Sequence, residues 1–147
     1  MKRHVCRLLP ILLLIPLVLV GCGKSGRPRY TIYMVNRTPR DFEGVAVYFD
    51  NKLAADKGSL VKGGCASFGY VTLPIPAEAE VRWIDQGAKH APRVKLEGRV
   101  PANPIEMNIY FIIENDESVT VAAVGQSDSD GNFEVTKGIE KLRDKQK

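Results

Sequence analysis

The clearest structural signal in this chain of 147 residues is the segment EMNIYFII at residues 106–113. Apolar side chains recur at every second position from Met107 to Ile113. Successive side chains of a β-strand point to opposite faces of a sheet, so this alternation is typical of a strand with one face in a core. The run Asn115-Asp116-Glu117 suits a hairpin turn, and residues 118–124 supply a returning strand. The segment therefore predicts a β-hairpin.

Short strand signals separated by turn residues continue towards the N-terminus. The further candidate strands are residues 30–35, 44–49, 59–62, 67–73, 80–84 and 93–96. Between them, residues 36–39 and 50–52 are typical of turns, and Ala54–Gly58 of one helical turn or a loop. This spacing predicts a mostly-β domain over residues 30–125, an antiparallel β-sandwich of Ig-like or similar type.

The C-terminal part, residues 126–147, has a different character. Gln126–Asn132 is a polar loop with an Asp-Gly turn, and we reject a calcium loop there because Lys137 would occupy its twelfth position. Val135, Ile139 and Leu142 follow at spacings of four and three. This pattern predicts a short C-terminal helix or tail.

The N-terminus carries Lys2, Arg3 and Arg7, followed by an apolar run at residues 8–21. A helix that spans a bilayer needs about 20 apolar residues, and this run is shorter and contains two prolines. A basic start followed by a short apolar stretch is typical of a secretory signal peptide. We therefore predict that residues 1–21 are a signal peptide.

The end of this run, Leu19-Val20-Gly21-Cys22, resembles the lipobox of bacterial lipoproteins. The resemblance implies signal cleavage between Gly21 and Cys22 and a thioether-linked diacylglycerol on the Cys22 thiol. Residues 22–29 would then be the lipidated cysteine and a flexible tether. Gly23 stands where an aspartate would retain a lipoprotein in the inner membrane, which implies a lipid-anchored protein of the cell envelope, at the outer membrane facing the periplasm.

Removal of the signal changes the charge and the cysteine count. The remaining chain would carry 18 basic and 17 acidic residues, a net charge of +1, without a basic stripe interleaved with aromatics. We therefore expect no nucleic-acid partner. Cys65 would be the one cysteine besides Cys22, and we expect it to be buried, because a reduced cysteine behaves as a small apolar residue.

The sequence shows no assembled catalytic or metal-binding set. His90 would be the one histidine left, in a predicted turn, where a solvated role is usual. Pairing with Asp85 in a nucleophilic mechanism is conceivable, but no Gly-x-Ser-x-Gly elbow supports it. One histidine and one cysteine fall short of a zinc site. We predict no catalytic residue, no metal and no cofactor, and a protein that is not an enzyme.

Trp83 is the single tryptophan, with Arg82 beside it. On an inner face Trp83 is a core anchor. On an outer face Trp83 and Arg82 would form an aromatic and basic contact for a protein partner. The five tyrosines would form a recognition patch if several of them shared one outer face.

The body also resembles a group of small proteobacterial lipoproteins of unknown function, some of them similar to immunity lipoproteins. The residues that carry this resemblance are Gly63-Gly64, Phe68, Val71-Thr72-Leu73-Pro74 and Val81-Arg82-Trp83. It implies no functional residues.

These observations give three functional hypotheses. The first is a membrane-anchored, non-catalytic protein-binding module of the envelope, such as an inhibitor or immunity protein that binds a toxin. The second is a structural accessory lipoprotein of an envelope or secretion assembly. The third, and least favoured, is a small periplasmic hydrolase that uses His90 and Asp85.

Overall fold

The structure, a computed structural model, describes residues 26–129, 131 and 132. The predicted signal peptide, Cys22 and the predicted helix from Val135 lie outside these residues. Among the described residues, no helix has the length and the apolar character that crossing a membrane requires.

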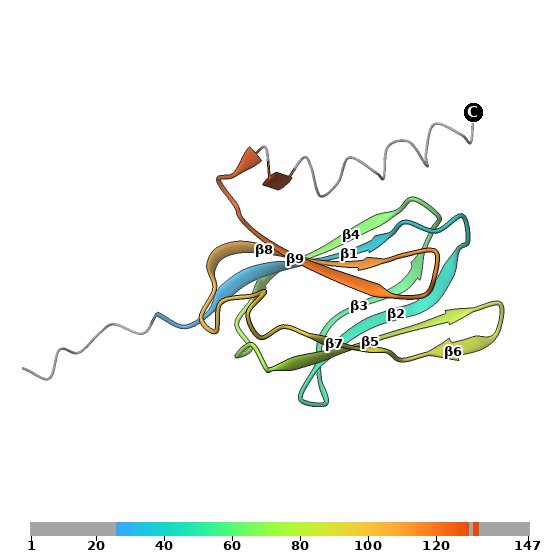
Figure 1. Ribbon diagram of the computed structural model, residues 1–147, viewed down its shortest axis with the longest axis horizontal. Helices are drawn as coiled ribbons and strands as arrows, with labels where there is room; N and C mark the ends of the chain where they lie inside the picture. The colour runs from blue at the N-terminus through green and yellow to red at the C-terminus, as the bar shows by residue number, and fades with distance from the viewer. Residues whose placement is uncertain (1–25, 130, 133–147) are drawn as a thin grey trace, which may run out of the picture.

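The described chain forms nine strands in two sheets that pack face to face (Figure 1). The strands are β1 (Arg29–Asn36), β2 (Phe42–Phe49), β3 (Lys52–Leu60), β4 (Cys65–Val71), β5 (Glu78–Asp85), β6 (Ala88–His90), β7 (Arg93–Lys95), β8 (Ile105–Ile113) and β9 (Val119–Gly125). The first sheet, sheet A, has the order β4-β1-β8-β9. The second, sheet B, has the order β3-β2-β5-β6, with β7 also paired to β5. The predicted mostly-β sandwich is therefore confirmed.

One pairing differs from the predicted antiparallel arrangement. β1 and β8 run parallel in the middle of sheet A, with Ile32 opposite Ile109 and Met34 opposite Phe111. Parallel neighbours cannot be joined by a tight turn, and these two strands lie far apart in the sequence. Alternation within a strand carries no information about the direction of its neighbour, so the sequence could not reveal this pair.

The strand β3 corrects a second prediction. Ala54–Gly58, expected to be a helical turn or a loop, lies inside this strand, and Ala55 and Lys57 pair with Val47 and Val45 of β2. Alanine, aspartate and glycine have low strand propensity, but cross-strand pairing overrides propensity. Charged residues also suit an edge strand, because they discourage pairing with other chains.

The core lies between the sheets and follows the alternation of the strands. Ala79, Val81 and Trp83 of β5 point inwards, and the Trp83 side chain is 1% exposed and packs at a tilt against Phe42. Trp83 is therefore a core anchor. The prediction that it contacts a partner is wrong, because the period of two in β5 places it on the inner face.

A second apolar cluster lies on the opposite face of sheet A. Val35, Tyr110 and Ile112 are buried there, and the rings of Tyr33 and Tyr110 stack with their centroids 4.7 Å apart. Cys65, expected to be buried, is partly buried beside this cluster. Tyr30 lies in the core and Tyr48 in sheet B, so the five do not share one face, but Tyr70 of β4 lines a hollow of sheet A together with Tyr33.

Candidate functional site

Four polar side chains meet at the end of the sandwich opposite the start of β1. They are Arg40 from the β1–β2 loop, Asp85 at the end of β5, His90 at the end of β6 and Glu117 from the β8–β9 turn. In Figure 1 the described chain enters at one end of the molecule, and the β5–β6 and β8–β9 turns lie at the other. We call these four residues the polar cluster.

Asp85 is buried because it follows the alternation of β5. It is two positions after Trp83, so its side chain also points inwards, and it is 5% exposed. Its Oδ2 lies 2.5 Å from Nη1 of Arg40. Its Oδ1 is buried and has no hydrogen-bond partner. A buried carboxylate oxygen without a partner is costly in free energy, which makes Asp85 unusual in this domain.

His90 is held in position by the β5–β6 hairpin. Gln86 and Gly87 both have positive φ angles, 48° and 85°, and return the chain so that His90 pairs with Trp83. The imidazole stacks on the Trp83 ring, with centroids 5.0 Å apart and an interplanar angle of 6°. His90 therefore lies in a strand, not in the predicted turn, and its ring plane is fixed.

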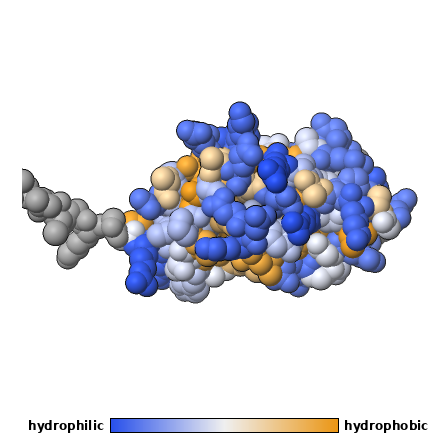
Figure 2. Space-filling view, turned by 90° about the horizontal axis from the view of Figure 1, so that it is seen from below, coloured by the Kyte–Doolittle hydropathy of each residue, from blue (hydrophilic) through white to orange (hydrophobic). Residues whose placement is uncertain are grey.

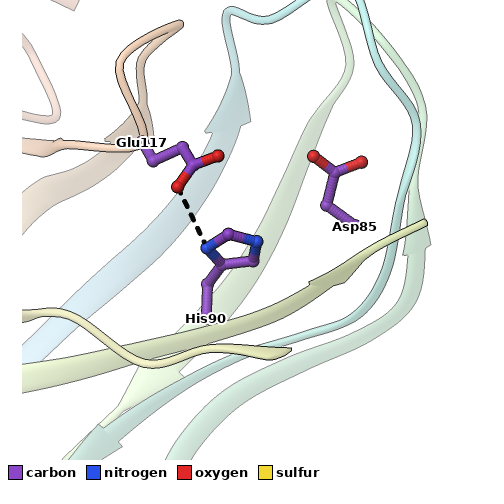
Figure 3. A group of neighbouring side chains, drawn as sticks. All are labelled: Asp85, His90 and Glu117. Atoms are coloured by element: carbon purple, nitrogen blue, oxygen red, sulfur yellow. Dashed lines mark ion pairs between the residues drawn. The ribbon is translucent and has the colours of Figure 1, made fainter. Parts of the chain in front are cut away.

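Glu117 completes the polar cluster from the side of sheet A. Its Oε2 lies 3.3 Å from Nδ1 of His90, and its Oε1 lies 3.7 Å from Nη2 of Arg40. Figure 3 shows the carboxylates of Asp85 and Glu117 on either side of the His90 ring. Asp85, His90 and Glu117 each offer one ligand atom, and these atoms lie within 4.8 Å of one another.

Half of the polar cluster is predictable from the sequence. The structure brings together Asp85 and His90, the pair considered for a nucleophilic mechanism, but Nδ1 of His90 faces Glu117. The sequence indicates only a turn at Glu117 and gives no signal for Arg40. The sequence signal for this site is the alternation of β5, which places the carboxylate of Asp85 on the same inner face of the sheet as Trp83.

Arg82, the other predicted contact residue, lies on the outer face of sheet B. Its guanidinium carbon lies 4.1 Å from the centroid of the Tyr48 ring, and its Nε donates a hydrogen bond to Oε1 of Glu80. This hydrogen bond raises the pKa of Arg82. Arg93 approaches Oε2 of Glu80 to 3.7 Å. We call Tyr48, Glu80, Arg82 and Arg93 the sheet B face; they line or adjoin a shallow hollow of about 360 Å³.

Figure 2 views the molecule from the side of sheet B. Hydrophilic side chains cover most of this surface, with apolar atoms showing between them. Aromatic residues and arginine are enriched at protein–protein interfaces, whereas the overall polarity of a surface does not distinguish one.

A second hollow, of about 380 Å³, lies where β1 begins. Arg29 stacks over Tyr70, with the guanidinium carbon 5.0 Å from the ring centroid, and Tyr70 is 76% exposed. Tyr70 and Glu106 lie at irregularities of β4 and β8 and have positive φ angles of 60° and 52°. Both residues line this hollow together with Arg29, at the end of the domain that the predicted tether joins.

The comparisons with known proteins identify no family. No protein-family model matches the chain, and no curated protein matches it. An NMR structure of a protein from Eubacterium rectale is similar, with 18% sequence identity and a TM-score of 0.46, and the match covers 71% of this chain and 96% of that one. The class of protein is therefore defined by its architecture, a two-sheet β-sandwich domain.

Proposed function

We propose that this protein is a lipid-anchored lipoprotein of the bacterial cell envelope that binds a protein partner without catalysis, through the sheet B face. The observation that carries the proposal is the Arg82 guanidinium held over the Tyr48 ring by Glu80. Arginine and tyrosine are enriched where interfaces release most of their binding energy. A side chain that is already held in place loses little conformational entropy when a partner binds.

The anchor is the second part of the proposal. Two or three acyl chains on Cys22 would hold the protein at a bilayer, since one chain alone binds only reversibly. The predicted tether at residues 22–29 leads to Arg29 at the start of β1. The sandwich would then extend from the outer membrane into the periplasm, where an envelope protein or a toxin can reach the sheet B face.

The partner proposal is tested by affinity purification of the full chain from detergent-solubilised envelopes. Arg82→Glu reverses the charge at the centre of the sheet B face and removes the stacking on Tyr48. Lys62→Glu makes the same change of charge at an exposed loop position and is the matched control. We expect wild type and Lys62→Glu to recover the same partner and Arg82→Glu to lose it by at least about tenfold, which corresponds to about 1.4 kcal/mol. Equal recovery by both variants, or no specific partner for wild type, would reject the proposal.

The anchor is tested by labelling cells with radioactive palmitate. We expect the wild-type protein to carry the label and its processed form to start at Cys22. We expect no label in Cys22→Ala. A wild-type protein without label would refute the anchor. A soluble Cys22→Ala variant exported to the periplasm separates the two non-catalytic roles. If it still binds the partner but does not support function in the cell, a structural accessory role is favoured over that of an inhibitor.

A further inference from the structure

We infer that the polar cluster is a binding site for a divalent transition-metal ion of the zinc type, with Asp85, His90 and Glu117 as its ligands. The inference concerns the far end of the sandwich and is independent of the sheet B face. It departs from the expectation, drawn from cysteine and histidine alone, that the chain offers no metal site.

The donor atoms have the right chemistry and nearly the right spacing. Zinc binds imidazole nitrogen at about 2.0–2.1 Å and carboxylate oxygen at about 2.0–2.2 Å, so two ligands of a tetrahedral ion lie roughly 3.3 Å apart. One ligand atom of each of Asp85, His90 and Glu117 lies within 4.8 Å of the other two, so a closure of up to roughly 1.5 Å would bring the three to this spacing. In Figure 3 one ring nitrogen of His90 contacts Glu117 and the other is on the side of Asp85.

The second observation that supports a metal site is a carboxylate oxygen of Asp85 without a hydrogen-bond partner. Oδ1 is buried and accepts no hydrogen bond, although the side chain is 5% exposed. The carboxylates of Asp85 and Glu117 and the His90 ring face a common space (Figure 3). We assign Oδ1, the oxygen without a hydrogen-bond partner, as the Asp85 ligand, so that a bound cation would be its partner.

Arg40 has the position of an outer partner. Its guanidinium contacts Oδ2 of Asp85 and Oε1 of Glu117. Hydrogen-bonded outer partners orient metal ligands, and the stacking on Trp83 does the same for the imidazole. The two carboxylates outweigh the single charge of Arg40, so the polar cluster keeps a net charge of −1 when His90 is neutral.

The ligand types select the ion. Calcium and magnesium prefer oxygen ligands alone, whereas an imidazole nitrogen with two carboxylates suits zinc and its first-row neighbours. Three residues leave the fourth position of a tetrahedral zinc ion to water or to a side chain of a partner.

The test is a Zn²⁺ titration of the full chain in detergent, after treatment with a chelator, followed by calorimetry. Glu117→Gln removes a ligand charge from the exposed β8–β9 turn. Glu114→Gln makes the same change in the same turn, at a carboxylate that pairs with Arg37, and is the matched control. We expect one Zn²⁺ per chain for wild type and for Glu114→Gln, and an affinity at least tenfold lower for Glu117→Gln.

Two further measurements distinguish a specific Zn²⁺ site from nonspecific binding of Zn²⁺ to the surface. At the same Zn²⁺ concentration, Zn²⁺ should raise the Tm of wild type and of Glu114→Gln more than that of Glu117→Gln, because stabilisation by a ligand grows with its affinity for the folded state. Co²⁺ in place of Zn²⁺ should give the visible absorption of a tetrahedral site, which His90→Gln abolishes. Absence of stoichiometric Zn²⁺ binding, equal affinity of the two glutamine variants, or tighter binding of Ca²⁺ than of Zn²⁺ would overturn the inference.

Discussion

At the scale of single residues, Asn36 shows how one side chain organises a loop. It is the last residue of β1 and is fully buried. Its Nδ2 donates to the carbonyl oxygens of Arg40 at 2.7 Å and Leu60 at 3.2 Å. Its Oδ1 accepts hydrogen bonds from the backbone nitrogen and the hydroxyl of Thr38, at 2.9 and 2.7 Å. Asn36 therefore joins the two sheets and shapes the loop that delivers Arg40 to the polar cluster.

Replacement of Asn36 by alanine should be strongly destabilising. Asn36→Ala removes the buried hydrogen bonds that this side chain makes to Leu60 and Thr38, and we expect the free energy of unfolding to fall by about 3 kcal/mol. Asn103→Ala, the same change at an exposed site, should alter it by less than about 0.5 kcal/mol. Urea denaturation measures both, and equal losses would contradict the role given to Asn36.

At the scale of elements, the β2–β3 hairpin depends on two residues with left-handed backbone conformation. Asp50 and Asn51 have φ angles of 47° and 63° and lie between the paired residues Phe49 and Lys52. Positive φ at both central residues defines the two-residue turn whose twist matches that of the strands. Aspartate and asparagine tolerate this conformation better than other residues that carry a Cβ.

The hairpin can be tested with a pair of substitutions at one position. Asn51→Val places a branched Cβ in the left-handed region and should lower the free energy of unfolding by roughly 1–2 kcal/mol. Asn51→Gly should leave it nearly unchanged, because glycine adopts this conformation freely. Thermal unfolding followed by circular dichroism compares the two, and a valine variant as stable as the glycine variant would show that the turn is not strained.

At the scale of the whole molecule, the two sheets are joined by an aromatic interior. Tyr30 of sheet A lies against Phe49 of sheet B, with ring centroids 6.5 Å apart, and Phe49 in turn lies 6.3 Å from Phe111. The Tyr30 hydroxyl donates a hydrogen bond to the carbonyl oxygen of Leu73 at 2.8 Å. Burial raises the pKa of Tyr30 well above its ordinary value, because a phenolate would lose its hydration there.

This shift predicts a loss of stability in alkaline solution. The unfolded chain releases the Tyr30 proton near pH 10, whereas the folded protein retains it to higher pH. The stabilisation is therefore complete below about pH 10 and declines above it, by up to about 1.4 kcal/mol per pH unit. Tyr30→Phe should have a flatter alkaline decline than wild type, and Tyr70→Phe, at an exposed ring, should follow wild type. Parallel declines in denaturation series from about pH 9 to about pH 12, roughly one unit below to two units above the usual tyrosine pKa, would contradict this.

Local pattern was sufficient for part of this architecture. Alternation in residues 106–113 and 80–84 indicated strands with one buried face, and the same period explains the inward positions of Trp83 and Asp85. These features follow from backbone geometry alone, since every second side chain of a strand points the same way. The lipobox and the C-terminal helix lie outside the described residues and stay predictions.

Long-range pairing was beyond the reach of any local pattern. The parallel β1–β8 pair and the strand at Ala54–Gly58 depend on hydrogen bonds to partners elsewhere in the chain. Arg40, Asp85, His90 and Glu117 come from four separate segments and meet because the loops and strand ends of both sheets converge at one end of the sandwich. Residue order specifies which face each side chain takes, whereas the packing of the two sheets specifies which of those side chains touch.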